Sequence, residues 1–292
     1  MGFAFLVHPL TARYVSRVIH WTRPLPGFLI ERLMKLRKPF EIMEFSLKGV
    51  KGFFIGCPLT SKQLITLDKR FVLKRLMQSC NVAERLGAKI ISLGAFSAIA
   101  SNHGLDLVNK VDVGLTTGRA YTVYVIMEQA KPYIRRDSVV GVVGAKGAIG
   151  SVVSELSSNH KLIKITRENF NDVYKVDVVI SATSSLNEII DARKLKKNCI
   201  VIDASKPSSI SEKSGRKDIT IIKGGLVKLP EPVDFGFDFD CPKDVVYACM
   251  AEPMILAMAG KFENFCLGNK IPLEKIQEIG KLGKKFGFSI FS

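Results

Sequence analysis

Short apolar runs alternate with longer mixed segments through the second half of the chain. From Ser138 onward, the runs lie in SVVGVV, KLIKIT, VDVVISAT, CIVIDAS and ITIIKGG. Runs of this length that end at small or polar residues are typical of buried strands, and their alternation with helix-length segments favours parallel pairing. The pattern predicts an α/β fold with a Rossmann-type, doubly wound parallel sheet over residues 136–245.

The first 135 residues show shorter and more varied patterns, which we interpret from helical periodicity and from alternation. The expected elements are one or two basic helices over 11–40 broken at Pro24 and Pro26, two strands over 42–56 around a Gly49–Gly52 turn, a helix over 66–87, a strand from Lys89 to Leu93 and a helix over 119–135. This mixture predicts an N-terminal α/β domain over residues 1–135, which we expect to bind the substrate.

Helical segments dominate the C-terminal part. Pro242 is suited to the start of a helix that reaches about Gly260, and a further helix is expected after Pro272. Pro253 has no N–H for the carbonyl of Cys249, so the first of these helices is expected to kink or end there. We expect residues 246–292 to pack back on the N-terminal domain.

A glycine-rich turn follows the first strand of the sheet domain. Gly144, Gly147 and Gly150 have the spacing GxxGxxG, a variant of the dinucleotide fingerprint GxGxxG. Glycine lets the backbone approach a pyrophosphate, and the N–H groups at the start of the next helix favour a bound phosphate. We therefore predict a dinucleotide site here, with a structural turn as the alternative. The site also includes Lys146, Ala148 and Ile149.

The end of the second strand decides between the two nicotinamide dinucleotides. NAD sites place an acidic residue about 20 residues beyond the glycines, where it accepts from the ribose 2′-hydroxyl. Thr166 and Arg167 occupy that place, and Arg167 lies twenty residues after Gly147. A hydroxyl and a guanidinium suit a 2′-phosphate, whereas the neighbouring Glu168 would favour NAD. We predict NADPH.

Later strands also end in small or polar residues, which suit a cofactor because the carboxyl ends of parallel strands meet at one edge. An ordinary turn is an equal alternative at each position. The residues are Ser181, Ala182, Thr183, Asp203, Ser205, Gly224 and Gly225.

Cys249 is the candidate nucleophile. Glu252 lies three residues later and so shares its helix face. A carboxylate raises the pKa of a nearby thiol, so activation would have to come from a cation, the helix end or the cofactor. A small core residue is the alternative, and it is the commoner role of cysteine in an apolar helix.

The net charge of +16 indicates an anionic partner. Residues 1–40 hold seven Arg and Lys against Glu31, a net +6. The absence of a recognition motif disfavours nucleic acid, and a solvated basic surface is the alternative. The six cysteines and four histidines have no zinc-binding or disulfide spacing. Because no apolar stretch reaches the ~18 residues of a membrane span, we expect a cytoplasmic protein.

Several blocks of the sequence resemble the long-chain acyl-[acyl-carrier-protein] reductase family, whose members form fatty aldehydes with NADPH. The blocks keep the family order over about residues 50–288, and they are Leu93–Ile99, Thr116–Gly118, Tyr121–Tyr124, Val142–Gly150, Tyr247–Glu252 and Asn264–Gly280. The resemblance implies that Cys249, beside Glu252, takes an acyl group from acyl carrier protein or coenzyme A before NADPH reduces it. It implies substrate-binding roles for Gly94, Phe96, Ser97, Thr117 and Gly118. If the substrate is carried on an acidic protein, the basic N-terminal segment and Lys69, Arg70, Lys74 and Arg75 are candidate docking charges, and a simply solvated helix face is the alternative.

The chain departs from the family pattern beside the Thr-Thr-Gly segment. The family continues with Asn and, two residues later, His, whereas this chain has Arg119 and Tyr121. Arg119 suits an anionic acyl donor or a carboxylate substrate. Tyr121 is either a proton donor to an oxyanion or a packed aromatic. Pro253 also stands where the family has a small residue.

Two other functions remain open. An NADP-dependent dehydrogenase of a small hydroxy or amino acid would share the two-domain plan of shikimate dehydrogenase, although the Lys–Asp motif of that family is absent from the sequence. A nucleotide-sensing or membrane-surface protein would use residues 11–40 as a basic amphipathic anchor.

Overall fold

The computed structural model describes residues 2–185, 187–211, 215–236 and 240–291, which divide into two compact units. The first unit comprises Met1–Gly118, Leu229–Asp244 and Cys249–Asn269. The second comprises Arg119–Lys228, Val245–Ala248 and Lys270–Ser292. Each unit has its own sheet and flanking helices, so the fold belongs to the α/β class.

The sheet of the first unit has the strand order β2-β3-β1-β4-β5. The strands are β1 (Gly2–Val7), β2 (Phe40–Leu47), β3 (Val50–Gly56), β4 (Ala88–Leu93) and β5 (Gly114–Thr116). β2 and β3 pair antiparallel, and all other pairs are parallel. The hairpin confirms the two strands expected over 42–56. Its turn lies at Lys48–Gly49, both with positive φ, so Gly52 belongs to β3.

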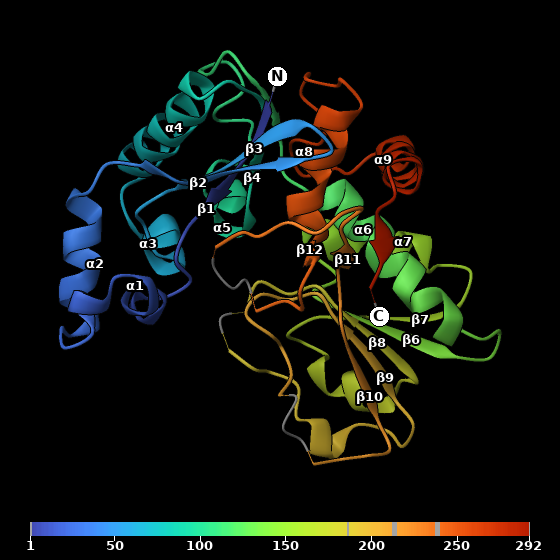
Figure 1. Ribbon diagram of the computed structural model, residues 1–292. Coiled ribbons are helices and arrows are strands. Elements are labelled where there is room, and N and C mark those ends of the chain that lie inside the picture. The colour runs from blue at the N-terminus through green and yellow to red at the C-terminus, as the bar shows by residue number, and fades with distance from the viewer. Residues whose placement is uncertain (1, 186, 212–214, 237–239, 292) are drawn as a thin grey trace. The chain divides into compact units, whose positions relative to one another are not determined.

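Three helices cover one face of this sheet. They are α3 (Ser61–Thr66), α4 (Lys69–Arg85) and α5 (Ala95–Ala100), and α4 runs along the sheet in Figure 1. Leu76 on α4 and Phe96 on α5 share a buried core with Ile91 of β4. The helix expected over 66–87 is confirmed, and it starts after Asp68, whose carboxylate accepts from the backbone N–H of Phe71 at 3.0 Å.

Aromatic rings cover part of the opposite face. Phe45 stacks on Phe54 with ring centroids 5.1 Å apart, and Phe235 meets both rings edge-on. Phe235 lies in the segment Leu229–Asp244, far along the chain. This packing gives a physical reason for that segment to belong to the first unit.

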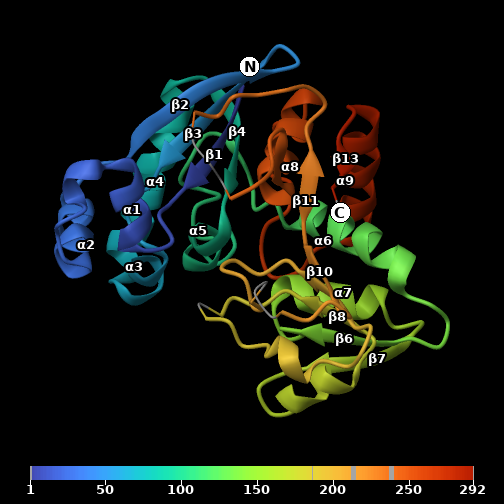
Figure 2. The same cartoon turned by 60° about the horizontal axis from the view of Figure 1, so that its bottom comes forward.

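A helical hairpin precedes β2. It consists of α1 (Ala12–Val18), the 3₁₀ helix η1 (His20–Thr22) and α2 (Gly27–Leu36). α1 and α2 lie side by side in Figures 1 and 2 and enclose a small core of their own, made of Ala12, Val15, Ile30 and Met34. The expected basic helices broken at Pro24 and Pro26 are confirmed.

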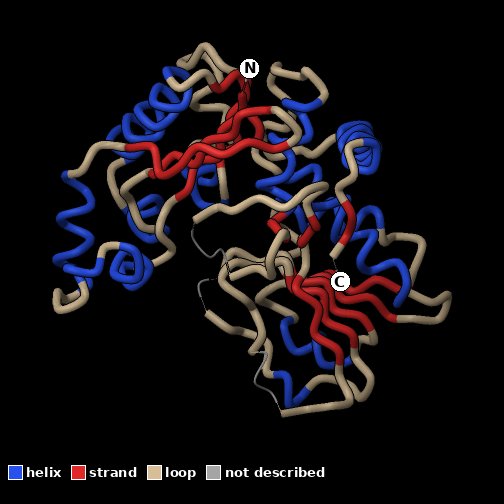
Figure 3. The backbone as a smooth tube through the Cα atoms, viewed as in Figure 1, coloured by secondary structure: helices blue, strands red, loops and turns tan. Residues whose placement is uncertain are grey.

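The sheet of the second unit is fully parallel, in the order β10-β9-β8-β6-β7. The strands are β6 (Val139–Val143), β7 (Lys161–Ile165), β8 (Val178–Ser181), β9 (Ile200–Asp203) and β10 (Thr220–Lys223), side by side in Figure 3. The chain passes from β6 to β7 on one side and then to β8 on the other. This is the doubly wound order, and its switch point lies at the carboxyl end of β6.

The connections in this unit are shorter than the sequence suggested. α6 (Arg119–Ala130) precedes β6, and α7 (Ala148–Leu156) connects β6 to β7 (Figure 2). After β7 and β8, the expected helix-length segments contain only the 3₁₀ helices η3 (Phe170–Lys175) and η4 (Ala192–Lys194). Their buried Val173 and Ala192 pack in the same core as Val179 of β8, so a short turn is enough to cover this face.

The last helix, α9 (Leu273–Lys285), confirms the helix expected after Pro272, and it packs on α6. Tyr121 and Tyr124 of α6 stack with ring centroids 5.9 Å apart. A Cβ at Gly280 would lie 2.3 Å from the Tyr124 ring, and a Cβ at Gly283 would lie 2.6 Å from the Tyr121 hydroxyl oxygen. The two glycines on α9 therefore make room for the tyrosine pair.

A small antiparallel sheet, which the sequence pattern did not predict, completes the second unit. Its strands are β11 (Leu226–Lys228), β12 (Val245–Tyr247) and β13 (Ser289–Ile290), with β11 in the middle. α8 (Ala248–Met258) starts directly after β12. The prediction that Pro242 opens this helix is wrong, because the chain first pairs as β12.

The units differ from the domains expected from the sequence. Residues 119–135 were expected in the N-terminal domain, but α6 clusters with the second unit because α7 and α9 pack on it. Residues 246–292 were expected to pack together on the N-terminal domain, but they divide between the two units. α9 packs on α6, which lies within residues 1–135, and Cys249–Asn269 belongs to the first unit. None of the helices in the described part of the chain is long and apolar enough to cross a bilayer.

We expect Gly283→Ala to lower the free energy of unfolding by about 1–3 kcal/mol, because the added methyl group overlaps the buried Tyr121 ring. Chemical denaturation followed by circular dichroism measures the change. Gly27→Ala in α2 is the control, since its nearest neighbour lies 3.5 Å away. Equal stability of the two variants would contradict the proposed packing.

Candidate functional site

The glycine turn connects β6 to α7 at the switch point of the second unit. Gly144 has a φ of +81°, and a Cβ there would lie 2.8 Å from the carbonyl oxygen of Ala182, just beyond β8. A Cβ at Gly150 would lie 2.2 Å from the carbonyl oxygen of Gly144. Close backbone packing therefore requires glycine at both positions.

Gly147 has a different environment, because a Cβ there would have only the Gly144 carbonyl oxygen, at 3.2 Å, and the Ala182 carbonyl oxygen, at 4.0 Å, nearby. It is exposed and forms the N-cap of α7, and no side chain caps this helix end. The backbone N–H groups of Ala148 and Ile149 follow in the first turn. An exposed glycine at an uncapped helix N-terminus suits a pyrophosphate, so the turn fits a dinucleotide.

Polar side chains beyond β7 bind one another. Thr166 donates its hydroxyl to the Glu168 carboxylate, and Lys146 Nζ lies 3.2 Å from the same group. These contacts, with the Thr166 hydrogen bond the largest, lower the pKa of Glu168 to about 2. Arg167 is exposed. The carboxylate that would favour NAD is thus bound to Thr166 and Lys146, and the neighbouring guanidinium is open to solvent.

The polar residues at the ends of β8 and β9 stabilise a loop. The Asp203 carboxylate accepts from the N–H groups of Ser205 and Ser209 and from the hydroxyls of Ser208 and Ser209, at 2.6–3.0 Å. Ser209 also donates to Ser181 Oγ at 2.8 Å. Asp203 and Ser181 therefore hold the segment 205–209, and the pattern of strand-end residues alone did not show this role.

Gly224 and Gly225 lie where β10 leads into β11. A Cβ at Gly224 would lie 2.8 Å from the backbone nitrogen of Ala204. Gly225, with a φ of +74°, donates its N–H to Gln129 Oε1 at 2.8 Å. The amide of the buried Gln129 also donates to the carbonyls of Lys223 and Phe291. Close backbone packing explains Gly224, the positive φ explains Gly225, and their cofactor role stays a prediction.

Cys249 lies in the first turn of α8, in the first unit. Its carbonyl oxygen accepts from Ser92 Oγ at 3.2 Å. This is the carbonyl to which Pro253 cannot donate. Of the two outcomes expected at Pro253, a kink or an end of the helix, the structure excludes the end, because α8 continues to Met258 and so nearly to Gly260, as expected. Ser92, at the end of β4, replaces part of the lost helical bonding. The sequence offered one indication that Ser92 has a special role: it is a hydroxyl residue inside the apolar run KIISL.

The Thr-Thr-Gly segment is bound to the same helix through Glu252. Thr116 donates its hydroxyl to Glu252 Oε1, and the N–H of Gly118 donates to the same oxygen at 3.0 Å. Glu252 is fully buried. A Cβ at Gly118, which has a φ of +74°, would lie 2.3 Å from Cys249 Cα. Only glycine allows this approach, so the segment fixes the backbone of Cys249.

Thr117 also has a structural contact, since its hydroxyl donates to the carbonyl of Cys266 at 2.8 Å. Asn264 accepts from the N–H of Leu115 at 2.8 Å. The contacts of Asn264, Cys266 and Gln129 were not anticipated from the sequence, although Asn264 and Cys266 lie in the block Asn264–Gly280. Substrate binding by Thr117 and Gly118 stays a prediction.

The environment of the Cys249 thiol favours the protonated form. Burial, followed by the negative charge of Glu252, raises its pKa to about 12, although the residue as a whole keeps partial exposure. All six cysteines are free thiols. Cys249 is therefore a protonated thiol rather than a thiolate at neutral pH. Any nucleophilic role requires removal of its proton.

Other expected substrate residues follow β4. A Cβ at Gly94 would lie 2.6 Å from the Phe5 ring, and Phe96 meets the His8 ring edge-on with centroids 6.0 Å apart. Ser97 is fully buried on α5. Burial lowers the pKa of His8 to about 4, so this imidazole is neutral at physiological pH. The carboxyl ends of β1 and β4 thus place His8 beside Phe96.

Arg119 and Tyr121 begin α6 in the second unit, and both are buried. Burial raises the pKa of Tyr121 well above its usual value, and its hydroxyl points at Gly283 of α9. This position favours the packed-aromatic interpretation over that of a proton donor.

Comparisons with known proteins give distant relatives. The chain is 25% identical to Aminotransferase PigE of Serratia sp., in an alignment that covers 100% of this chain. It spans only 40% of the length of that protein. It is also 25% identical to Long-chain acyl-[acyl-carrier-protein] reductase of Synechococcus elongatus, over 82% of this chain and 83% of the relative. No protein-family model matches the sequence.

Among solved structures, the chain aligns with a 5,10-methylenetetrahydrofolate dehydrogenase from the silkworm Bombyx mori. The alignment covers 97% of this chain and 88% of that structure, at 12% identity and a TM-score of 0.37. A TM-score this low carries no argument. The similarity to the reductase indicates a related family and supports an oxidoreductase role.

We expect Glu252→Gln to make Cys249 more reactive toward iodoacetamide, by roughly tenfold at a given pH, because the amide keeps an acceptor oxygen but removes the charge that raises the thiol pKa. In the unsubstituted protein the rate should rise about tenfold per pH unit from pH 7 to 10, since the thiolate fraction grows until the pKa near 12. Peptide mass spectrometry resolves Cys249 from the other cysteines.

The exposed Glu263→Gln serves as the charge control and should leave the rate unchanged. A rate that levels off below pH 9 would contradict the environment described for the thiol.

Proposed function

We propose that the protein reduces a long-chain acyl thioester to a fatty aldehyde with NADPH, through an acyl group carried on Cys249. The observation that carries the proposal is the position of this cysteine in the first turn of α8, where Ser92, Gly118 and Glu252 contact its backbone or its helix turn. A cysteine that only fills a core has no need of such a framework. The similarity to the reductase supports the same chemistry.

In the first step, the Cys249 thiol exchanges with the thioester R–CO–S–X. The C–S bond to X breaks, the bond between the acyl carbon and Cys249 Sγ forms, and the thiol proton leaves with X as HS–X. Partial burial keeps water away from the acyl group, which limits hydrolysis. Because the thiol is held protonated, the exchange requires that the proton of Cys249 pass to the departing thiolate X–S⁻, either directly or through a residue near Cys249.

The second step reduces the acyl group. The dinucleotide, when bound at the glycine turn, would supply the hydride. Addition of hydride and a proton to the acyl carbonyl, followed by cleavage of the bond to Sγ, releases R–CHO and restores the thiol. Gly147, Ala148 and Ile149 would hold the pyrophosphate, and Thr166 with Arg167 would hold the 2′-phosphate of NADPH.

The acyl donor is acyl carrier protein or coenzyme A, both of which are anionic. Of the four cations proposed on α4, Lys69 already pairs with Asp106 at 2.9 Å, and Arg75 donates to Gln78 and to the carbonyl of Lys35. Arg70 and Lys74 are exposed and lie four residues apart, so they share one face. We assign the docking role to this pair.

Incubation with a long-chain acyl coenzyme A should add the mass of one acyl group to the protein, and Cys249→Ser should abolish the addition. Intact-mass spectrometry without NADPH measures the adduct, and hydroxylamine should remove it. Cys241→Ser, at a partly exposed cysteine, is the matched control and should still be labelled. Equal labelling of Cys249→Ser and the unsubstituted protein would overturn the thioester mechanism.

We expect NADPH to bind more tightly than NADH, and Arg167→Ala to weaken NADPH binding by about 10- to 100-fold, the usual loss for a hydrogen bond to a charged group. NADH binding should change little. Lys161→Ala is the control, because Lys161 is exposed at the opposite end of β7. Titration calorimetry gives each Kd, and tighter binding of NADH than of NADPH would overturn the choice of cofactor.

A further inference from the structure

We propose that the helical hairpin formed by α1, η1 and α2 is a docking surface for an anionic lipid membrane. The proposal does not depend on the reductase activity. It rests on three features of the hairpin: bulky apolar side chains that are exposed, a set of exposed cations on the same segment, and an internal core that other residues form.

The hairpin carries the most exposed large hydrophobic side chains among the described residues. Phe28 and Leu36 are each 74% exposed and Trp21 is 64% exposed, and Leu33 adds a fourth at 39%. The remaining exposed residues of this kind, Ile42, Ile65, Ile99, Leu105 and Leu273, are 38–49% exposed and lie outside the hairpin. We call the four side chains of the hairpin, which lie within sixteen residues, the apolar patch. Exposed apolar side chains gathered on one element suggest a surface that another apolar phase covers.

Other side chains form the core of the hairpin. Ala12 and Val15 of α1 pack against Ile30 and Met34 of α2 and bury the inner face. The outward residues therefore remain exposed in a folded hairpin, and a substitution there removes surface rather than core.

The same hairpin carries exposed cations, namely Arg13, Arg23, Arg32, Arg37 and Lys38. Glu31 is the single acidic residue of the segment 11–40, and its carboxylate lies 3.4 Å from the Thr60 hydroxyl. One acidic side chain from elsewhere contacts the hairpin, because the Tyr14 hydroxyl donates to the Asp240 carboxylate at 3.1 Å. The cations of the hairpin therefore outnumber the acidic side chains on or against it.

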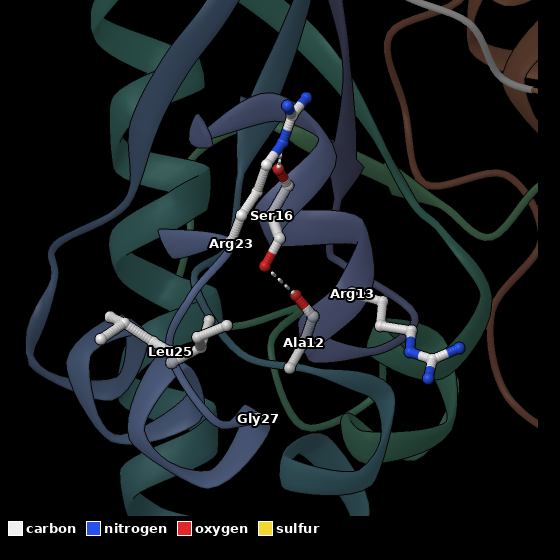
Figure 4. A pocket seen from close by; sticks show the side chains of 7 residues that line it. Ala12, Arg13, Ser16, Arg23, Leu25 and Gly27 are labelled. Atoms are coloured by element: carbon white, nitrogen blue, oxygen red, sulfur yellow. Dashed lines mark hydrogen bonds between the residues drawn. The ribbon is translucent and has the colours of Figure 1, made fainter. Parts of the chain in front are cut away.

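A hollow of about 470 Å³ opens between α1 and α2. Figure 4 shows Arg13 and Arg23 at its rim with their guanidinium groups directed away from each other, and Ala12 and Leu25 line its wall. Arg23 Nε donates to the carbonyl of Ser16 at 3.4 Å. Cations that diverge in this way suit several separate phosphate headgroups better than a single bound anion.

A lipid surface fits this combination better than an acidic protein does. Carboxylates on a protein would satisfy the cations but would offer no apolar phase to Phe28, Leu36 and Trp21. The headgroup region of a bilayer offers both, since Trp prefers the interface and Phe and Leu enter the acyl boundary. Each cation near an anionic surface strengthens binding about fivefold.

Flotation of the full chain with vesicles tests the proposal. We expect binding to vesicles of phosphatidylcholine with 30% phosphatidylglycerol, at least tenfold weaker binding to phosphatidylcholine alone, and release at 0.5 M salt. The apolar variant Trp21→Ala/Phe28→Ala/Leu36→Ala should lose binding at least tenfold. The charge variant Arg13→Gln/Arg32→Gln/Lys38→Gln should do the same.

Matched controls test whether vesicle binding depends on the hairpin itself or on the overall charge and exposed hydrophobicity of the chain. Ile65→Ala/Leu105→Ala/Leu273→Ala removes exposed apolar side chains elsewhere, and Lys161→Gln/Lys197→Gln/Lys217→Gln lowers the net charge equally. Both should bind as the unsubstituted protein does, and thermal unfolding should show that every variant is folded. The proposal is overturned if the protein does not bind anionic vesicles, or if the control variants lose binding as much as the hairpin variants do. It is also overturned if the hairpin instead mediates a concentration-dependent dimer or the capture of acyl carrier protein.

Discussion

The buried carboxylate of Glu252 is the interaction on which the candidate nucleophile depends. It accepts from the Thr116 hydroxyl and the Gly118 N–H, so it ties the end of β5 to the first turn of α8. A buried charge without such partners would cost several kcal/mol, so these bonds stabilise both the helix start and the Thr-Thr-Gly segment. The same carboxylate raises the pKa of the Cys249 thiol, which links the framework of the site to its reactivity.

Backbone contacts, more than side chains, define both parts of the candidate site. Gly118 lies against Cys249 in the first unit, and Gly144 lies against Ala182 in the second. Each contact excludes even a methyl group. Several residues that the sequence motifs assign to cofactor or substrate binding therefore also have a structural role. Thr117 donates to a carbonyl, Asp203 holds a serine-rich loop, and Tyr121 fills the groove that two glycines leave on α9.

Charge and apolar exposure are distributed unevenly over the first unit. The α1–α2 hairpin combines its own small core with exposed aromatic and cationic side chains, while α4 presents Arg70 and Lys74 to solvent. Both surfaces would attract anions, but only the hairpin adds an apolar patch. The proposed long-chain acyl substrate and the proposed lipid-docking hairpin are compatible, because long acyl chains partition into membranes.

The sequence by itself determined the parallel sheet, the glycine turn, α4 and α9, because period, length and glycine spacing are local properties. It missed β1, an apolar run at the start of the chain whose sheet partners β3 and β4 lie far along the sequence, and it missed β11–β13, which are too short to carry a pattern. Only the tertiary structure paired Ser92 of β4 with Thr116 of β5, so that both hydroxyls reach α8 from one face of the sheet. Such a pairing depends on strand order, which residues far apart in the chain decide together.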